Sequence, residues 1–194
     1  MNTQPRKSRY YAVVVFSALC LAAGWLVKTA VEGRTVRLVD AKSGVSLSYP
    51  ASWLRLPEAD AIVTVIDPQS PGPFSTSFTV RTGPLAGSQD PSNLAVQVSA
   101  ERAHSLALYR TSSVEPVELS GVKGIRIEYA YAADPVGIAA GRTSIPRVAR
   151  AVDVVVRRGD LAYYFTFAAD DVAYAGVLPT FERILKSVTI HQGR

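Results

Sequence analysis

Apolar and polar positions alternate along much of the chain, as they do in strands that bury one face of a sheet. In residues 45–49, Val45, Leu47 and Tyr49 share one face and the two serines between them share the other. Pro50 ends this strand, because proline cannot donate to a hydrogen-bond ladder. Similar patterns predict strands over residues 35–40, 61–67, 74–81, 114–119, 123–132, 148–157 and 161–168.

Two of these segments differ in how they are expected to be covered. Residues 61–67 are apolar on both faces, which indicates a strand covered on both sides. In residues 74–81 we expect Phe74, Phe78 and Val80 to face the core, with polar residues between them facing away.

Two segments carry the signals of helices. Asp90 can cap a helix that begins at Pro91, where the missing N–H of proline costs nothing. We expect this helix to run to about Tyr109 and to bury some of its apolar residues, Leu94, Ala95, Val98, Leu106 and Tyr109. Apolar residues at helical spacing predict a second helix over about 179–188: Phe181, Ile184, Leu185 and Val188. The pair Asp170-Asp171 is interpreted as a helix cap rather than a cation site.

Alternating strands favour antiparallel pairing, and a strand that is apolar on both faces needs helices to cover it. Arg158-Gly159 is predicted to form a two-residue hairpin turn between the last two strands. The fold class that satisfies these patterns is α+β: an antiparallel β-sheet flanked by helices, an αβα sandwich formed by residues 35–194.

The N-terminal segment is predicted to be a transmembrane helix. Residues 10–27, YYAVVVFSALCLAAGWLV, contain eighteen residues without a charge, enough to span the hydrocarbon core at ~1.5 Å per residue. Tyr10, Tyr11 and Trp25 lie near its ends, where amphipathic rings favour the membrane interface.

The charges beside this segment predict its orientation. Three basic residues precede it within residues 1–9, and the positive-inside rule keeps that tail in the cytoplasm. We therefore expect a single-pass protein of the cell membrane, with an anchor over residues 10–27, a linker over 28–34 and an extracytoplasmic domain over 35–194.

A cleaved signal peptide is the alternative for the same segment. The small residues Ala22, Ala23 and Gly24 permit cleavage before Trp25, although the apolar run continues beyond that point. Leu19 stands before Cys20, where a lipoprotein needs a small residue, so lipidation is not expected. Either way, the domain lies outside the cytoplasm.

Composition excludes several classes of function. Most of the formal charge of +5 belongs to the N-terminal segment, since the residues from Gly33 onward include 17 basic and 15 acidic side chains. The folded part is therefore nearly neutral, which gives no support for nucleic-acid binding. One cysteine and two histidines, His104 and His191, are too few for a disulfide or a Cys/His metal site. Nucleophile elbows, phosphate-binding glycine loops and His-Glu-x-x-His are also missing. We therefore expect no catalytic residue, no metal and no cofactor.

Several short sequence motifs follow one another along the chain in an order that is found in a known protein family. GVSLSYPASW (residues 44–53) ends a strand in Tyr-Pro-x-x-Trp, and Asp67-Pro68 is followed by FSTSFTV. GVKGIRIEY, AYYFTF and FERILKSV follow later in the chain. Over about residues 38–190 this succession resembles the PsbP/Mog1-like superfamily.

The resemblance implies an antiparallel sheet between helical layers, in proteins that are often exported and tied to a membrane. Members act mainly as accessory or assembly proteins, the plant ones on the lumenal face of photosystem II, and the family supplies no shared catalytic residue. The charged extension that plant PsbP uses on the photosystem has no counterpart here, so a photosystem role is not implied. Trp53 is expected in the core.

The function that we expect is that of a non-catalytic, membrane-anchored extracytoplasmic subunit that assists or assembles an integral-membrane protein complex. The alternative is a stand-alone exported ligand-binding domain, which would contain a deep apolar pocket. A third class, an exported hydrolase, would need a site in which His104 meets a carboxylate and a hydroxyl.

Residues 134–147, DPVGIAAGRTSIPR, separate two strands by more residues than a tight hairpin needs, and long loops on rigid sheets often carry binding. Arginines cluster in sequence around this loop: Arg142, Arg147, Arg150, Arg157 and Arg158. The two interpretations are a solvated edge with a mobile loop, and a contact surface for a partner or for anionic headgroups.

Overall fold

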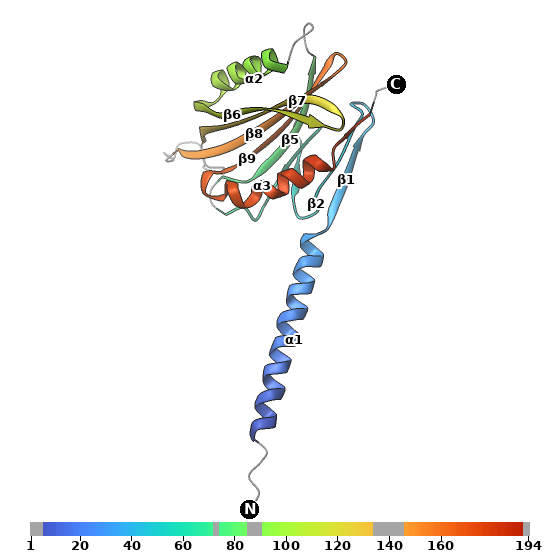
Figure 1. Cartoon of the computed structure of the whole chain (residues 1–194), viewed down its shortest axis with the longest axis vertical. Coiled ribbons are helices and arrows are strands. Elements are labelled where there is room, and N and C mark those ends of the chain that lie inside the picture. The colour runs from blue at the N-terminus through green and yellow to red at the C-terminus, as the bar shows by residue number, and fades with distance from the viewer. Residues whose placement is uncertain (1–5, 72–73, 85–90, 134–145, 192–194) are drawn as a thin grey trace, which may run out of the picture.

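The computed structural model describes residues 6–71, 74–84, 91–133 and 146–191 (Figure 1). The elements in chain order are α1 (Arg6–Glu32), β1 (Thr35–Asp40), β2 (Val45–Pro50), β3 (Leu54–Leu56), β4 (Val63–Ile66), β5 (Ser77–Pro84), α2 (Pro91–Ser105), β6 (Ala107–Leu119), β7 (Val122–Ala133), β8 (Arg147–Arg158), β9 (Leu161–Asp170), α3 (Asp171–Lys186) and β10 (Thr189–Ile190). The predicted cap Asp90 and residues 134–145 of the predicted loop lie outside the described ranges.

The strands form two antiparallel sheets. A seven-stranded sheet has the order β3-β4-β5-β9-β8-β7-β6, and a three-stranded sheet has the order β1-β2-β10. The pairings in both sheets are antiparallel, which confirms the inference from the alternating pattern.

The seven-stranded sheet is covered on both faces, so the α+β sandwich is confirmed (Figure 1). On one face, α3 and the three-stranded sheet enclose the larger core, in which Phe78, Phe165 and Phe181 are fully buried. Trp53 joins this core as predicted: it is 8 % exposed, and its ring centroid lies 6.5 Å from that of Phe167. On the other face, apolar residues of α2 pack against β7, β8 and β9.

Helix α2 ends four residues before the predicted end at Tyr109. Leu108 has a φ of 54°, in the left-handed region that no residue of a right-handed helix adopts. The chain therefore leaves the helix at Ser105 and enters β6 at Ala107, well before the predicted strand start at residue 114. Leu106 and Tyr109 still pack against the α2 core from outside the helix.

Helix α3 begins earlier than predicted, at Asp171, and Pro179 lies inside it rather than in its first turn. The predicted cap is confirmed, since Asp170 Oδ1 accepts a hydrogen bond from the amide of Val172 at 3.1 Å.

The prediction that Phe74 lies on the same face as Phe78 and Val80 is wrong. Phe74 precedes β5 and packs with Tyr131 on the α2 side, because alternation with Phe78 holds only within the strand.

Two hairpin turns use residues at positive φ. Arg158 pairs with Leu161, so the turn between β8 and β9 is Gly159-Asp160, one residue beyond the predicted pair, with Gly159 at φ 62°. Ser120 and Gly121 join β6 to β7 with φ values of 53° and 75°, as a type I′ turn requires.

Strand β6 is an edge of the seven-stranded sheet and pairs only with β7. Its register shifts between Ala107 and Arg110 and again between Thr111 and Ser113. Such irregularities bend a strand and increase its twist. Pro116, farther along β6, has no N–H to offer to a further strand.

The predicted N-terminal helix is confirmed as a helix, α1, which projects away from the sheets (Figure 1). Its side chains from Tyr11 to Trp25 are exposed. Among the residues that the structure describes, no helix combines the length and hydropathy expected of a membrane span. The anchor over residues 10–27 is not supported by this result and stays a prediction. Residues 28–32, expected in a linker, continue α1 and leave only Gly33 and Arg34 before β1.

We predict that Gly124→Ala destabilises the chain, because Gly124 allows β7 to approach β8 closely. A Cβ there would meet the carbonyl oxygen of Val155 and would lie 2.6 Å from Val156 Cγ1. Overpacking of this kind costs ~1–3 kcal/mol. The control is Gly176→Ala in α3, where a Cβ meets nothing within 4 Å and should add about 0.5–1 kcal/mol of stability. Urea unfolding measures both changes, and equal midpoints for the two variants would contradict the prediction.

Candidate functional site

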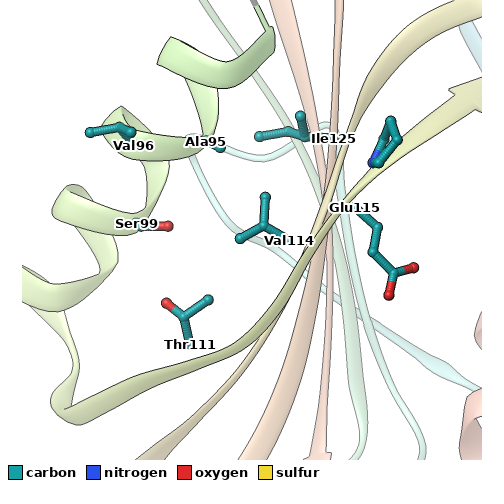
Figure 2. Close-up of a pocket in the computed structure, with 8 residues that line it drawn as sticks. Ala95, Val96, Ser99, Thr111, Val114, Glu115 and Ile125 are labelled. Carbon is teal, nitrogen blue, oxygen red and sulfur yellow. The ribbon is translucent and has the colours of Figure 1, made fainter.

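An apolar groove with a volume of about 690 Å³ lies between α2 and β6 (Figure 2). We call it the α2–β6 groove, and its lining residues come from three elements: Ala95, Val96 and Ser99 of α2; Thr111, Val114, Glu115 and Pro116 of β6; and Ile125 of β7. Figure 2 shows Ser99 pointing from α2 toward the space that Val114 and Thr111 share. Glu115 points to the other side of β6.

The groove lies beside the apolar face that α2 packs against the sheet. Leu94, Ala95 and Val98 bury against Ile127 and its neighbours on β7 and β8. Two of the three α2 residues that line the groove, Ala95 and Ser99, are small and leave space beside them. Val96 and Val114 are therefore 70 % and 49 % exposed, so the groove presents apolar surface to solvent.

A buried ion pair holds α2 against the sheet. Asp153 lies in β8 with 0 % of its surface exposed. Arg102, near the end of α2, donates from Nε to Asp153 Oδ2 at 2.8 Å and from Nη2 to Oδ1 at 3.2 Å. Nη2 also donates to Thr166 Oγ1 at 3.0 Å. This bidentate geometry is the favourable one for arginine and carboxylate, and it neutralises the carboxylate within the sheet.

Tyrosines surround this ion pair and stay protonated. Burial raises the pKa of Tyr129 far above its usual range, and the negative charge of Asp153 adds to the effect. Burial likewise raises the pKa of Tyr131 to about 12. Burial alone would lower the pKa of Arg102, but the nearby Asp153 carboxylate outweighs it and raises that pKa. The network is thus fixed in one charge state at neutral pH and acts as a structural clamp on α2.

The histidines do not assemble a catalytic group in the described residues. His104 is exposed on α2, and the neighbouring Ser105 hydroxyl donates to the backbone carbonyl of Glu101 at 3.0 Å. His191 is exposed beyond β10. Within the described ranges, no three His, Cys, Asp or Glu residues are grouped in a way that could hold a metal ion.

The predicted arginine cluster is divided by the length of β8. Arg147 and Arg150 lie at its start, whereas Arg157 and Arg158 lie at its end, and Arg142 is outside the described residues. Residues eleven apart in a strand are separated by about 35 Å. Arg157 donates to the carbonyl of Gly159 at 2.9 Å, and Arg158 donates to that of Ile190. The structure therefore separates Arg147 and Arg150 from the other pair, and because the two lie three residues apart in β8 they point to opposite faces of the sheet.

The aromatic residues predicted at the membrane interface lie on α1. Tyr11 and Trp25 are exposed there, and the side chain of Tyr10 is outside the described residues.

Sequence reasoning missed both the groove and the ion pair. The groove joins residues that are distant in sequence and has no local signature. The ion pair does have a local signature in the sequence. Asp153 is the only charged residue within VDVVV, and a carboxylate inside an apolar strand requires a buried partner.

No protein-family model matches the chain, and a search of the curated proteins found no match. Solved structures do match in fold. The cyanobacterial PsbP (CyanoP) of Synechocystis has a TM-score of 0.54 and 13 % identity, covering 81 % of this chain and 92 % of that one. LpqN of Mycobacterium tuberculosis, involved in cell envelope biogenesis, has a TM-score of 0.55 and 16 % identity, covering 82 % and 91 %.

The Ran-binding protein Mog1p of Saccharomyces cerevisiae is also similar, with a TM-score of 0.52 and 8 % identity over 81 % of this chain and 95 % of that one. These likenesses show that the chain has the PsbP/Mog1-like fold, as the sequence resemblance indicated.

We predict that Asp153→Ala lowers the free energy of unfolding by about 3–5 kcal/mol, because it leaves Arg102 buried without its counter-ion. The double variant Arg102→Met with Asp153→Val removes both charges and should recover most of that loss. Chemical unfolding followed by circular dichroism measures both. Equal losses in the single and double variants would show that the buried charge is not the cause.

Proposed function

We propose that the chain is a non-catalytic accessory subunit, held at the outer face of a membrane by α1, that binds an integral-membrane protein complex. The observation that carries this proposal is the surface of α1. The large apolar side chains that the structure describes on it, within residues 11–25, are each more than half exposed: Tyr11, Val13, Val14, Val15, Phe16, Leu19, Leu21 and Trp25. A helix that is apolar all round needs an apolar surrounding, and a bilayer supplies one.

The short connection between α1 and β1 supports a membrane-protein partner. Gly33 and Arg34 are the two residues between the helix and the first strand, and they span at most ~7 Å. With α1 in the bilayer, the domain would stay beside the headgroups. The proteins it could reach are those whose outer segments lie at the same surface.

The similar folds support binding rather than catalysis. Mog1p is described as a Ran-binding protein and LpqN as involved in cell envelope biogenesis. The described residues of this chain offer an apolar groove, and no three His, Cys, Asp or Glu residues among them are grouped to hold a metal ion. We assign the α2–β6 groove to an apolar segment of the partner, because Val96 and Val114 expose apolar surface there.

A second candidate function rests on the same groove. Its volume of about 690 Å³ lies within the roughly 300–1,000 Å³ of small-molecule sites, and its lining is mainly apolar. A stand-alone domain that binds an apolar small molecule would use the groove without a protein partner.

We predict that protease added to intact cells or spheroplasts removes the domain beyond Gly33. The basic residues at the start of α1, Arg6, Lys7 and Arg9, would keep the N-terminus in the cytoplasm and leave the domain exposed outside. Immunoblotting with an antibody to the domain measures the loss, with a cytoplasmic protein as the control. A domain that stays intact until the cells are lysed would contradict this orientation.

We predict that Val96→Glu with Val114→Glu lowers the recovery of the membrane partner at least tenfold in affinity purification from native membranes. The charges would lie in the groove and would have to be desolvated by a bound apolar segment. The matched control is Val36→Glu with Val39→Glu on β1, where both valines are also exposed. Partner recovery that is equal in the two variants would exclude the groove. A wild-type chain that purifies alone, with a small apolar molecule seen by native mass spectrometry, would support the second candidate.

A further inference from the structure

The face of the seven-stranded sheet that carries α3 contains a second uncovered region. Helix α3 packs over β8 and β9 and reaches β7 through the ion pair of Glu182 with Arg126, whereas Ala107 and Arg110, at the other end of β6, are exposed. Near the start of β8, Arg110 pairs in register with Ala130, and Ala130 pairs with Arg150. Residues paired directly across antiparallel strands share a face, so two arginines flank one alanine on this side of the sheet. We call this row the arginine clamp.

Both arginines of the clamp can approach another anion. No ion pair of Arg110 is found among the described residues, and its side chain is exposed. Arg150 forms a loose, half-exposed ion pair with Asp171, in which Nε lies 3.8 Å from Oδ1, longer than a hydrogen bond. Since neighbouring strands are ~4.8 Å apart, the two Cα atoms are about 10 Å apart, and both guanidinium groups can reach a carboxylate above Ala130.

A buried donor lies next to the clamp. The guanidinium carbon of Arg150 lies 4.7 Å from the ring centroid of Tyr174, which is 3 % exposed. The Tyr174 hydroxyl is buried and has no hydrogen-bond partner in the described part of the chain. Burial raises its pKa to about 12, so it remains a neutral O–H donor at physiological pH. The Tyr174 ring thus supports the Arg150 guanidinium beside the clamp, and its hydroxyl carries no charge that would repel an anion.

The row beside the clamp is apolar. Ala107, Ala132 and Val148 pair in register, and Val148 is 55 % exposed. On β8 this row lies two residues from the arginine row, or roughly 7 Å along the strand. A bound peptide in extended conformation, running parallel to the strands, would therefore contact the arginines with one side chain. Its next side chain on the same face, two residues farther along the peptide, would contact the apolar row.

We propose that the arginine clamp binds an acidic segment of a protein partner, with a Glu or Asp between Arg110 and Arg150 and an aliphatic residue two positions away against Val148. Planar guanidinium groups match a carboxylate by paired hydrogen bonds. The apolar row favours a peptide over an anionic lipid headgroup, because a headgroup presents no aliphatic group at that spacing. The site is separate from α1 and from the α2–β6 groove, so it does not depend on the function proposed above.

The test uses the full chain in a neutral detergent and a fluorescein-labelled peptide, Gly-Ser-Glu-Ser-Val-Ser-Glu-Ser-Val-Ser-Gly, with fluorescence anisotropy as the readout. We expect Arg110→Glu to weaken binding at least tenfold, because it replaces one clamp charge with its opposite. Arg37→Glu, the same charge change at an exposed position of β1, should leave the affinity unchanged. A peptide with Gln in place of each Glu should bind at least tenfold more weakly.

Equal binding of the Glu and Gln peptides, or equal loss in Arg110→Glu and Arg37→Glu, would overturn the proposal. A second arm measures binding to phosphatidylglycerol and phosphatidylcholine vesicles. Loss of phosphatidylglycerol binding in Arg110→Glu, without any binding of the Glu peptide, would assign the clamp to lipid and also overturn it. The Val96→Glu, Val114→Glu variant should keep its full peptide affinity, which separates failure of this inference from failure of the groove.

Discussion

The buried carboxylate of Asp153 is the constraint on which one whole side of the molecule depends. A charge without access to water must be neutralised within the sheet, and Arg102 does so from the end of α2. This contact fixes where α2 crosses the sheet, because the arginine must reach one particular residue of β8. The apolar contacts of Leu94 and Val98 then bury the rest of the helix face. The uncovered strip beside β6 is what remains once that position is set.

The central strands were predictable because their side chains alternate with period two, and the register of β7, β8 and β9 follows that alternation. The ends of the elements were not. Leu108 turns the chain out of α2 by a backbone angle that apolar periodicity does not encode, and the apolar spacing from Phe181 onward shows only the second half of a helix that Asp170 caps much earlier. The short strands β3 and β10 contain too few residues to show a period at all.

The candidate sites were less predictable than the fold, since each one joins residues through the strand register. Five arginines close in sequence suggested one surface, but an extended strand separates its two ends. Arg110 was not among them, yet pairing through Ala130 brings it opposite Arg150. A sequence pattern shows which side of a strand a residue occupies. It does not show which residue on the neighbouring strand lies opposite, and that pairing determines which charged side chains become neighbours in the candidate sites.

The irregular path of β6 has a consequence for how the protein behaves in concentrated solution. A thirteen-residue edge strand is a ready template for pairing with another molecule, and such pairing leads to aggregates and fibrils. Two register shifts and Pro116 interrupt the row of hydrogen-bonding groups that a regular edge would present. No long stretch of β6 can then add a further strand in register. The irregular path of β6 thus leaves a long strand at the edge of the sheet while limiting its tendency to polymerise.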